Sequence, residues 1–261
     1  MAIISIANAK GGTGKTTAAV LLAMEFARKG GKVVILDCDP LAFAAKWHGL
    51  PRTIETISVV TGVTFANLGS NLRMLQGQVS HIIIDLSCAR DALVALAAGL
   101  SDLVLIPVQG CAMDAQGAAH VLDLVGQVQS NARGHINHAV VLTRVNSFVT
   151  TRAMRSVKAL LASRGVAFLD VPIMERSAYR DMFEQGGSLY AMNEGRVSNL
   201  AKALANMQAL ALEVERCIVG PLHLQSNCSL ARIGYKAPAE VSPPWKRAAG
   251  PTDPDVFHIV L

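Results

Sequence analysis

The sequence predicts a doubly wound α/β fold, in which a mostly parallel sheet carries helices on both faces. Two observations support this prediction. Short, almost purely aliphatic runs alternate with longer segments of helical character, as expected for strands that are buried on both faces. Hydrophobic residues make up 51% of the chain but aromatic residues only 5%, so a large core must be mainly aliphatic. Ligands of such sheets bind at the carboxyl ends of the strands.

The expected elements follow one another in a regular order. Strands are predicted at residues 2–8, 32–37, 81–85, 103–108 and 138–145. Helices are predicted at residues 16–30, 67–78, 90–100, 113–130, 151–164 and 197–217. After the last helix, helical periodicity disappears and prolines stand at positions 221, 238, 243, 244, 251 and 254. We therefore expect one domain over residues 1–217 and a flexible tail over residues 218–261.

The segment GGTGKTT, residues 11–17, joins the first predicted strand to the first predicted helix. This is the setting of a phosphate-binding loop, where glycines let backbone N–H groups converge on phosphate oxygens and the helix N-terminus adds its dipole. Lys15 is expected to reach the β- and γ-phosphates of ATP, and the Thr16 hydroxyl to ligate Mg²⁺. The expected nucleotide contacts in this loop are Gly11, Gly12, Thr13, Gly14, Lys15, Thr16 and Thr17.

Acidic residues end two of the other predicted strands. Asp37 and Asp39 lie in "ILDCDP", and Asp85 ends "IIID". A carboxylate at the end of such a strand can hold Mg²⁺, usually through water, although any one of them alone could instead cap a helix. Together with the phosphate loop, the three acids favour metal binding and water positioning. Cys38, between the first two, is interpreted as a packing residue, with a thiol-sensitive site as the alternative.

The expected location is the cytoplasm. The apolar N-terminus lacks a basic stretch, and a cleaved signal peptide would remove the phosphate loop. No apolar run approaches the roughly 18–20 residues of a membrane span. The five cysteines show no Cys-x-x-Cys spacing, so free thiols are expected.

Residues 2–216 resemble the deviant-Walker ATPases of the ParA/MinD family. The resemblance rests on KGGTGKTT, DCDP, IIIDLS, SDLVLIPVQ and the later stretch PIMERSAY. It implies a P-loop NTPase fold and a slow, partner-stimulated ATPase that forms a homodimer on ATP. Two departures leave the coupling of ATP to a partner open. Leu41 replaces the Gln common in the family, and Leu86–Ser87–Cys88 replace its Thr-Pro-Pro.

The resemblance also implies roles for individual residues. Lys10 matches the signature lysine that reaches the ATP of the second subunit, and Asp39 the residue that positions or activates the attacking water. Lys15 and Thr16 match the phosphate-binding lysine and the Mg²⁺ ligand. Asp37 and Asp85 match the acids around Mg²⁺. Residues in the region of the adenine are Thr143, Arg144, Asn146 and Pro172.

The Lys10 assignment makes physical sense. Phosphoryl transfer spreads negative charge over the γ-phosphate oxygens, and a second cation stabilises that charge as an arginine finger does. If the cation comes only from a second subunit, hydrolysis depends on dimerisation. The resemblance therefore implies a slow ATPase whose hydrolysis sets how long the dimer lasts. ATP joins the two subunits, and hydrolysis separates them.

A basic segment suggests DNA as the ligand of the dimer. No acid interrupts residues 144–164, and Arg152, Arg155 and Lys158 share one helix face. Arg180, Arg196 and Lys202 could extend this patch. Such contacts to phosphates give non-specific, salt-sensitive DNA binding. The expected protein binds the nucleoid when loaded with ATP, and a ParB-like or cargo-adaptor partner resets it, so that it partitions plasmid or chromosomal DNA or positions a cargo.

Two other functions stay open as alternatives. A MinD-like membrane ATPase needs a basic amphipathic helix near the end of the chain, whereas the predicted helix 197–217 has only Lys202 and Arg216 against Glu213 and Glu215. Membrane binding is therefore not expected. An ATP-dependent ligase or amidase needs a second catalytic constellation, and none is recognisable in the sequence.

Overall fold

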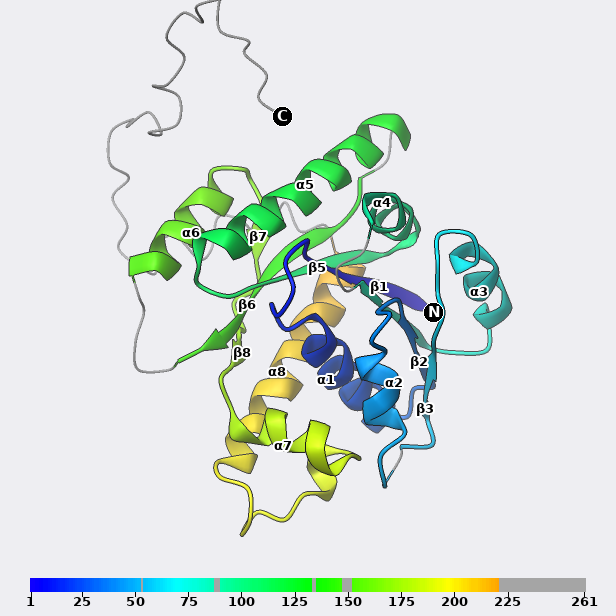
Figure 1. Cartoon of the computed structure of the whole chain (residues 1–261), viewed down its shortest axis with the longest axis vertical. Helices are drawn as coiled ribbons and strands as arrows, with labels where there is room; N and C mark the ends of the chain where they lie inside the picture. The colour runs from blue at the N-terminus through cyan, green and yellow to red at the C-terminus, as the bar shows by residue number, and fades with distance from the viewer. Residues whose placement is uncertain (53, 87–89, 133–134, 147–151, 221–261) are drawn as a thin grey trace, which may run out of the picture. The chain divides into compact units, whose positions relative to one another are not determined.

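The predicted fold class is confirmed. A computed structural model describes the chain except for residues 53, 87–89, 133–134, 147–151 and 221–261. One parallel sheet carries helices on both of its faces (Figure 1). Its strands run in the order β3-β2-β4-β1-β5-β6-β7, and β8 also pairs with β6. Helices join the consecutive strands from β1 to β7 and cover both faces, so the sheet is doubly wound.

The strands are β1 (Ala2–Ala7), β2 (Val33–Asp37), β3 (Ile57–Val60), β4 (His81–Leu86), β5 (Leu103–Val108), β6 (His138–Val145), β7 (Ala167–Phe168) and β8 (Ile173–Met174). The helices are α1 (Lys15–Arg28), α2 (Phe43–His48), α3 (Leu68–Leu75), α4 (Asp91–Leu100), α5 (Ala112–Ala132), α6 (Arg152–Ala162), α7 (Ser177–Gln185) and α8 (Leu200–Val219), with a short 3₁₀ helix η1 (Leu189–Ala191).

Strand register brings the predicted site residues to one edge of the sheet. β1 lies between β4 and β5, so the loop that follows it starts at the centre of the sheet. Asp37 at the end of β2 is the register partner of Asp85 on β4. Ala7 at the end of β1 pairs with Leu86. The carboxyl ends of these strands therefore surround the start of α1, as predicted for a ligand site.

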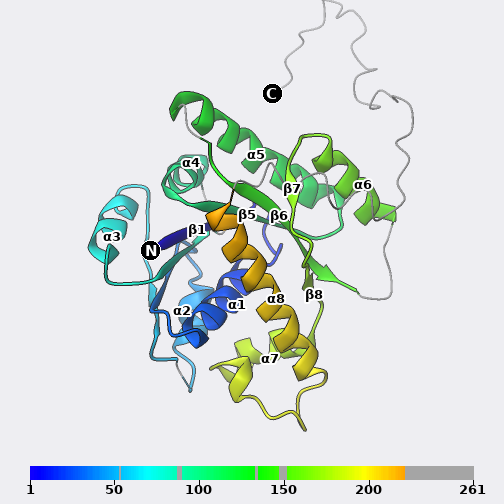
Figure 2. The ribbon, with the colours of Figure 1, turned by 180° about the vertical axis from the view of Figure 1, so that it is seen from behind.

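Two apolar layers hold the helices on the sheet. On one face, α1, α2, α7 and α8 pack against side chains such as Ile6, Ile35 and Ile83. On the other, α3, α4, α5 and α6 pack against alternating residues such as Leu36 and Ile84. Figure 2 shows α8 lying beside α1 across the first of these faces. Burial on both sides explains why the strands read as continuous aliphatic runs.

Several short elements escaped the sequence analysis. The six-residue helix α2 follows Ala42, whose φ of 49° is left-handed, and its length is too short for a recognisable period. The edge strand β3 and the two-residue strands β7 and β8 are also short, and α7 was not predicted. The predicted helix 197–217 begins at Leu200, after left-handed Asn199, and extends to Val219.

The proposed tail from residue 218 starts inside α8, and from residue 221 onward it lies outside the described residues. Its boundary and flexibility therefore stay predictions. Within the part of the chain that the structure describes, none of the helices has the length and apolar character needed to cross a bilayer.

Candidate nucleotide site

The loop between β1 and α1 has the backbone form that an anion site requires. Gly12 and Gly14 adopt φ angles of 77° and 94°, in the left-handed region that glycine tolerates. Gly14 is also the N-cap of α1, and the first turn of this helix contains no acidic residue. The N–H groups at the start of α1 are therefore available to an anion without a competing carboxylate of the same turn.

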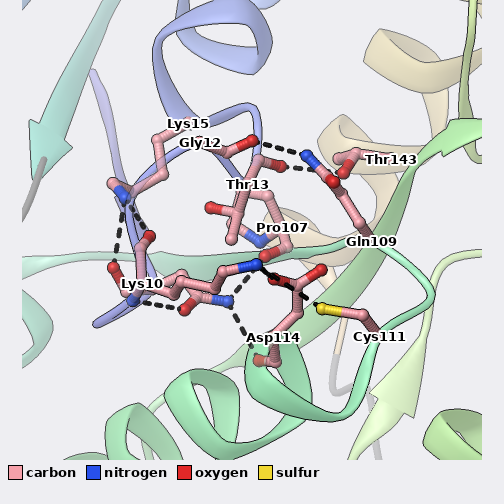
Figure 3. Close-up of polar contacts among 10 residues, drawn as sticks. Lys10, Gly12, Thr13, Lys15, Pro107, Gln109, Cys111, Asp114 and Thr143 are labelled. Carbon is pink, nitrogen blue, oxygen red and sulfur yellow. Dashed lines mark hydrogen bonds and ion pairs between the residues drawn. The ribbon is translucent and has the colours of Figure 1, made fainter.

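Lys15 and Thr16 stand at the start of α1. The buried Lys15 Nζ donates to the carbonyl oxygens of Lys10 at 2.8 Å and Asn8 at 3.2 Å, so the ammonium lies within the loop itself (Figure 3). The Thr16 Oγ1 donates to Asp85 Oδ2 at 2.7 Å. This contact places a hydroxyl and a carboxylate side by side, as the predicted Mg²⁺ ligand set requires.

The three predicted acids have different environments. Asp37 is buried, and its two oxygens accept backbone N–H groups from Asp39 at 3.0 Å and Ala45 at 3.1 Å. It therefore holds the segment that carries Asp39. Asp39 is half-buried, and its carboxylate accepts only one hydrogen bond from the described residues, from Leu41 N at 2.9 Å. The Asp39 carboxylate thus accepts fewer hydrogen bonds from the described residues than the Asp37 carboxylate does.

Asp85 has the donor chemistry of a metal site. Its side chain is fully buried, and Oδ1 has no hydrogen-bond partner among the described residues. Burial raises the pKa of this carboxyl to about 7. The described residues contain no group of three or more His, Cys, Asp or Glu side chains that could hold a metal. The residues fit a Mg²⁺ ion bound through Thr16, phosphate and water, near the orphaned oxygen of Asp85.

The raised pKa of Asp85 predicts that the stability of the folded chain depends on pH. Between about pH 4 and pH 7 the folded chain keeps a proton on this carboxyl that the unfolded chain has released. The free energy of unfolding contributed by Asp85 therefore falls as pH rises through this range, by on the order of a few kcal/mol. Urea denaturation of the nucleotide-free protein at several pH values measures this effect. The free energy of unfolding of Asp85→Asn, which cannot titrate, should fall less over this pH range than that of the wild type. Parallel pH profiles of the two proteins would contradict the raised pKa of Asp85.

Lys10 forms an ion pair within its own chain. Its Nζ donates to Asp114 Oδ1 at 2.5 Å and to Cys111 Sγ at 3.5 Å (Figure 3). The Lys10 side chain is 33% exposed, whereas Asp114 is completely buried in the first turn of α5. The hydrogen bond to Asp114 is the main cause that raises the pKa of Lys10, so the ammonium stays charged. The Lys10 and Lys15 ammonium groups have different partners and point in different directions.

Asn8 and Gln109 tie the loop to the end of β5. The buried Asn8 Nδ2 donates to Pro107 O at 2.8 Å, and its Oδ1 accepts from Lys10 N at 2.9 Å. Gln109 Nε2 donates to Gly12 O at 2.5 Å. Sequence reasoning missed these two residues and Asp114, because their contacts join the region of the loop to residues about a hundred positions further along the chain. The only sequence signal was that Asn8 and Gln109 stand at the ends of predicted strands, whereas Asp114 lies within the predicted helix 113–130.

Gly117 should be needed for this arrangement. A Cβ at Gly117 of α5 would collide with Asn8 Oδ1 and come within 3.0 Å of Lys10 N. We expect Gly117→Ala to lower the free energy of unfolding by about 1–3 kcal/mol through overpacking, and to weaken nucleotide binding. Gly126→Ala on the same helix is the matched control, because a Cβ there meets nothing within 4 Å. Urea denaturation that gave both variants the same stability would rule out this role for Gly117.

The residues predicted near the adenine have mixed positions. Thr143 is buried, and its Oγ1 donates to Thr13 O at 2.8 Å, so it braces the phosphate loop. Arg144, with a left-handed φ of 50°, and Asn146 are exposed at the end of β6. Pro172 is half-buried, and its carbonyl accepts from Asn206 Nδ2 at 2.8 Å. Contact of these residues with a base stays a prediction.

The predicted DNA-binding residues form two groups. Arg152 and Arg155 are exposed on α6, with Lys158 half-buried beside them. The second group lies on or near α7 and α8 and consists of Arg180, Arg196 and Lys202, all of which are exposed. Figures 1 and 2 place α6 in the upper part of the view and α7 in the lower part, so the two groups lie apart on one chain. Arg180 is also paired with Glu175 at 2.6 Å.

Cys38 is half-buried between the acids, and burial raises the pKa of its thiol to about 12. A thiol of this kind is protonated and unreactive at neutral pH, which favours the packing interpretation. The described cysteines Cys38, Cys111 and Cys217 are free, as expected.

The parallel sheet, the loop after β1 and the start of α1 define a P-loop nucleotide-binding protein. Residues 4–189 match the sequence model of the CobQ/CobB/MinD/ParA nucleotide binding domain, and the chain belongs to this family. It is 33% identical to the protein ParA of Rhizobium radiobacter over 214 residues, covering 82% of this chain and 96% of that protein. The resemblance read from the sequence is thereby confirmed.

Two further proteins are similar to this chain. The maintenance of carboxysome distribution protein A of Gloeobacter kilaueensis is 27% identical over 220 residues, covering 82% of this chain and 94% of that protein. The structure of a Cyanothece McdA–ATP complex matches with a TM-score of 0.66 at 16% identity, covering 82% of this chain and 96% of that one. This second similarity shows the fold.

Proposed function

We propose that this chain is a ParA-like ATPase that dimerises on ATP and, as a dimer, binds DNA non-specifically. A partner protein, ParB-like or a cargo adaptor, stimulates hydrolysis and resets the cycle. Repeated cycles partition plasmid or chromosomal DNA or position a cargo. The 33% identity to a ParA protein and the similarity to proteins that distribute carboxysomes support this class of function.

The observation that carries the proposal is the position of Lys10. Its ammonium lies on the α5 side of the loop, against Asp114, and does not lie with Lys15. We therefore assign Lys15 to the nucleotide of its own chain. A second cation that is one-third exposed at the edge of the same loop is suited to the phosphates of another subunit.

The proposed reaction follows from these positions. The loop N–H groups and Lys15 bind the phosphates, and Lys10 of the second subunit adds the charge that stabilises transfer. Asp39, whose carboxylate is only lightly engaged, positions the water. Mg²⁺, which Thr16 and Asp85 would help to hold, would supply neutralisation of phosphate charge. Hydrolysis removes the γ-phosphate that attracts Lys10, and the two subunits separate.

One contact suggests how the nucleotide site could affect DNA binding. Gly110, between β5 and α5, packs closely against α6, because a Cβ there would lie 2.9 Å from Met154 Cε. The neighbouring Gln109 bonds to the phosphate loop. A single short segment therefore contacts both the nucleotide loop and the helix that carries Arg152 and Arg155.

Retention on non-specific duplex DNA with ATP, with ADP and without nucleotide tests the proposal. We expect retention with ATP only. Equal retention under all three conditions would contradict an ATP-controlled switch. Liposome co-sedimentation as a parallel assay should show no ATP-dependent binding.

The α6 group should carry most of the DNA affinity. Replacing Arg152, Arg155 and Lys158 together by alanine is expected to weaken DNA binding by about 10- to 100-fold at moderate salt, and to flatten its salt dependence. ATP binding should not change. The triple alanine variant of Arg180, Arg196 and Lys202 measures the second group separately. Wild-type DNA affinity in the α6 variant would assign the DNA surface elsewhere.

A further inference from the structure

The ion pair between Lys10 and Asp114 joins a fully buried carboxylate to a partly exposed ammonium group. Asp114 is completely buried, and its Oδ2 has no hydrogen-bond partner among the described residues. Its Oδ1 therefore takes its charge-balancing contact from Lys10, a partner that is one-third exposed. A charge buried in this way is strongly held by its partner, because losing the partner leaves it uncompensated.

Lys10 cannot form this ion pair and contact the phosphates of a second subunit at the same time. The ammonium is in hydrogen-bond contact with Asp114 at 2.5 Å, with the sulfur of Cys111 at 3.5 Å. To reach phosphates of a second subunit, the same ammonium has to leave both. The backbone N–H of Lys10 can stay in place, because Asn8 holds it at 2.9 Å. Only the flexible side chain has to move.

The position of Asp114 reduces the cost of leaving its carboxylate without Lys10. It lies in the first turn of α5, where the helix dipole favours a negative charge. Phosphate groups of ATP carry more charge than one carboxylate, so they can compete for the ammonium, whereas a subunit without nucleotide offers no such competitor.

We propose that Asp114 is a positioning residue that restrains Lys10 within its own chain until the nucleotide of a second copy displaces it. This inference rests on the proposed function and adds a regulatory step to it. Asp114 opposes dimerisation in the absence of ATP, and it recovers Lys10 when the γ-phosphate is lost. The pair thus sets a threshold for dimer formation and assists dimer release.

Asp114→Asn tests the restraint, because it keeps the shape of the side chain and removes its charge. With a slowly hydrolysed ATP analogue, sedimentation equilibrium should show a dimer dissociation constant about tenfold lower than that of the wild type. Asp123→Asn is the matched control, since Asp123 lies on the same helix in an exposed pair with Arg164 and should leave dimerisation unchanged. Asp114→Ala serves in its place if the Asn variant does not fold.

A double variant shows whether the effect passes through Lys10. In a Lys10→Ala background, Asp114→Asn should give no further gain in dimerisation. An unchanged or higher dissociation constant for Asp114→Asn overturns the proposal, and so does an equal gain in both backgrounds.

A nucleotide-free measurement separates this inference from the proposed function. Acylation of Lys10 by an N-hydroxysuccinimide ester, followed by mass spectrometry and normalised to the exposed Lys32, reports how tightly the ammonium is held. Asp114→Asn should raise the Lys10 rate severalfold. An unchanged rate overturns the restraint even if ATP dimers form, whereas a raised rate with no ATP dimer in the wild type supports the restraint and removes the proposed function.

Discussion

Lys10→Ala is expected to reduce partner-stimulated ATP hydrolysis by about 100- to 1,000-fold, since it removes a cation that acts on the transition state. ATP binding by the single chain should be largely preserved. The reason is the geometry of the loop, where Lys15 lies with the loop carbonyls and Lys10 lies against Asp114. Phosphate release measured with the activating partner present, together with equilibrium binding of a fluorescent ATP analogue, separates the two effects.

Lys32→Ala is the matched control for this experiment, because Lys32 is exposed and lies at the opposite end of β2 from the site acids. It should behave as the wild type in both assays. Unchanged stimulated hydrolysis in Lys10→Ala would remove the role of the second cation. A parallel loss of ATP binding would instead assign Lys10 to the nucleotide of its own chain.

Asp39→Ala is expected to reduce hydrolysis by about 100-fold or more and to leave ATP binding intact, because it removes the group that positions water. The variant should accumulate as an ATP-bound dimer that stays on DNA. The distinction from Asp37 is structural, since both oxygens of Asp37 accept backbone N–H groups, whereas among the described residues only Oδ1 of Asp39 accepts one, from Leu41. Single-turnover hydrolysis and the lifetime on DNA measure the two effects.

Glu55→Ala, which removes an exposed acid that precedes β3 and lies away from the carboxyl ends of the strands, is the control for Asp39→Ala and should leave the hydrolysis rate unchanged. If Asp39→Ala hydrolysed ATP at the wild-type rate, another group would have to position the water. If it lost ATP binding, its carboxylate would have a part in holding the nucleotide site together.

The main features of the fold could be predicted because they depend on local patterns. Aliphatic runs marked β1, β2, β4, β5 and β6, and the glycines of the phosphate loop marked its turn. The acids at positions 37 and 85 could be placed in one site because parallel strands bring their carboxyl ends together, and they are indeed register partners. Short elements such as α2 and β3 were missed because they contain too few residues to show a period.

The polar side chains that hold the phosphate loop and Lys10 against β5 and α5 could not be predicted in the same way. Asn8, Gln109 and Asp114 are recognisable as important only once β5 is known to lie beside β1. The direction of the Lys10 side chain is also a tertiary property, set by a partner 104 positions away. The spacing of Arg152, Arg155 and Lys158 predicted a shared helix face, but the sequence could not reveal that α7, which carries Arg180, lies away from α6 in the fold (Figure 1).

The central claim is that Lys10 of one subunit acts on the ATP of the other, and mixing two inactive variants tests it directly. In a dimer of Lys10→Ala with Asp39→Ala, the first subunit keeps its own Asp39 and receives Lys10 from the second, so one of the two sites is complete. Random mixing in equal amounts should restore about a quarter of the stimulated wild-type rate, although each variant alone is inactive. A mixture that forms ATP-bound heterodimers but stays inactive would contradict the account.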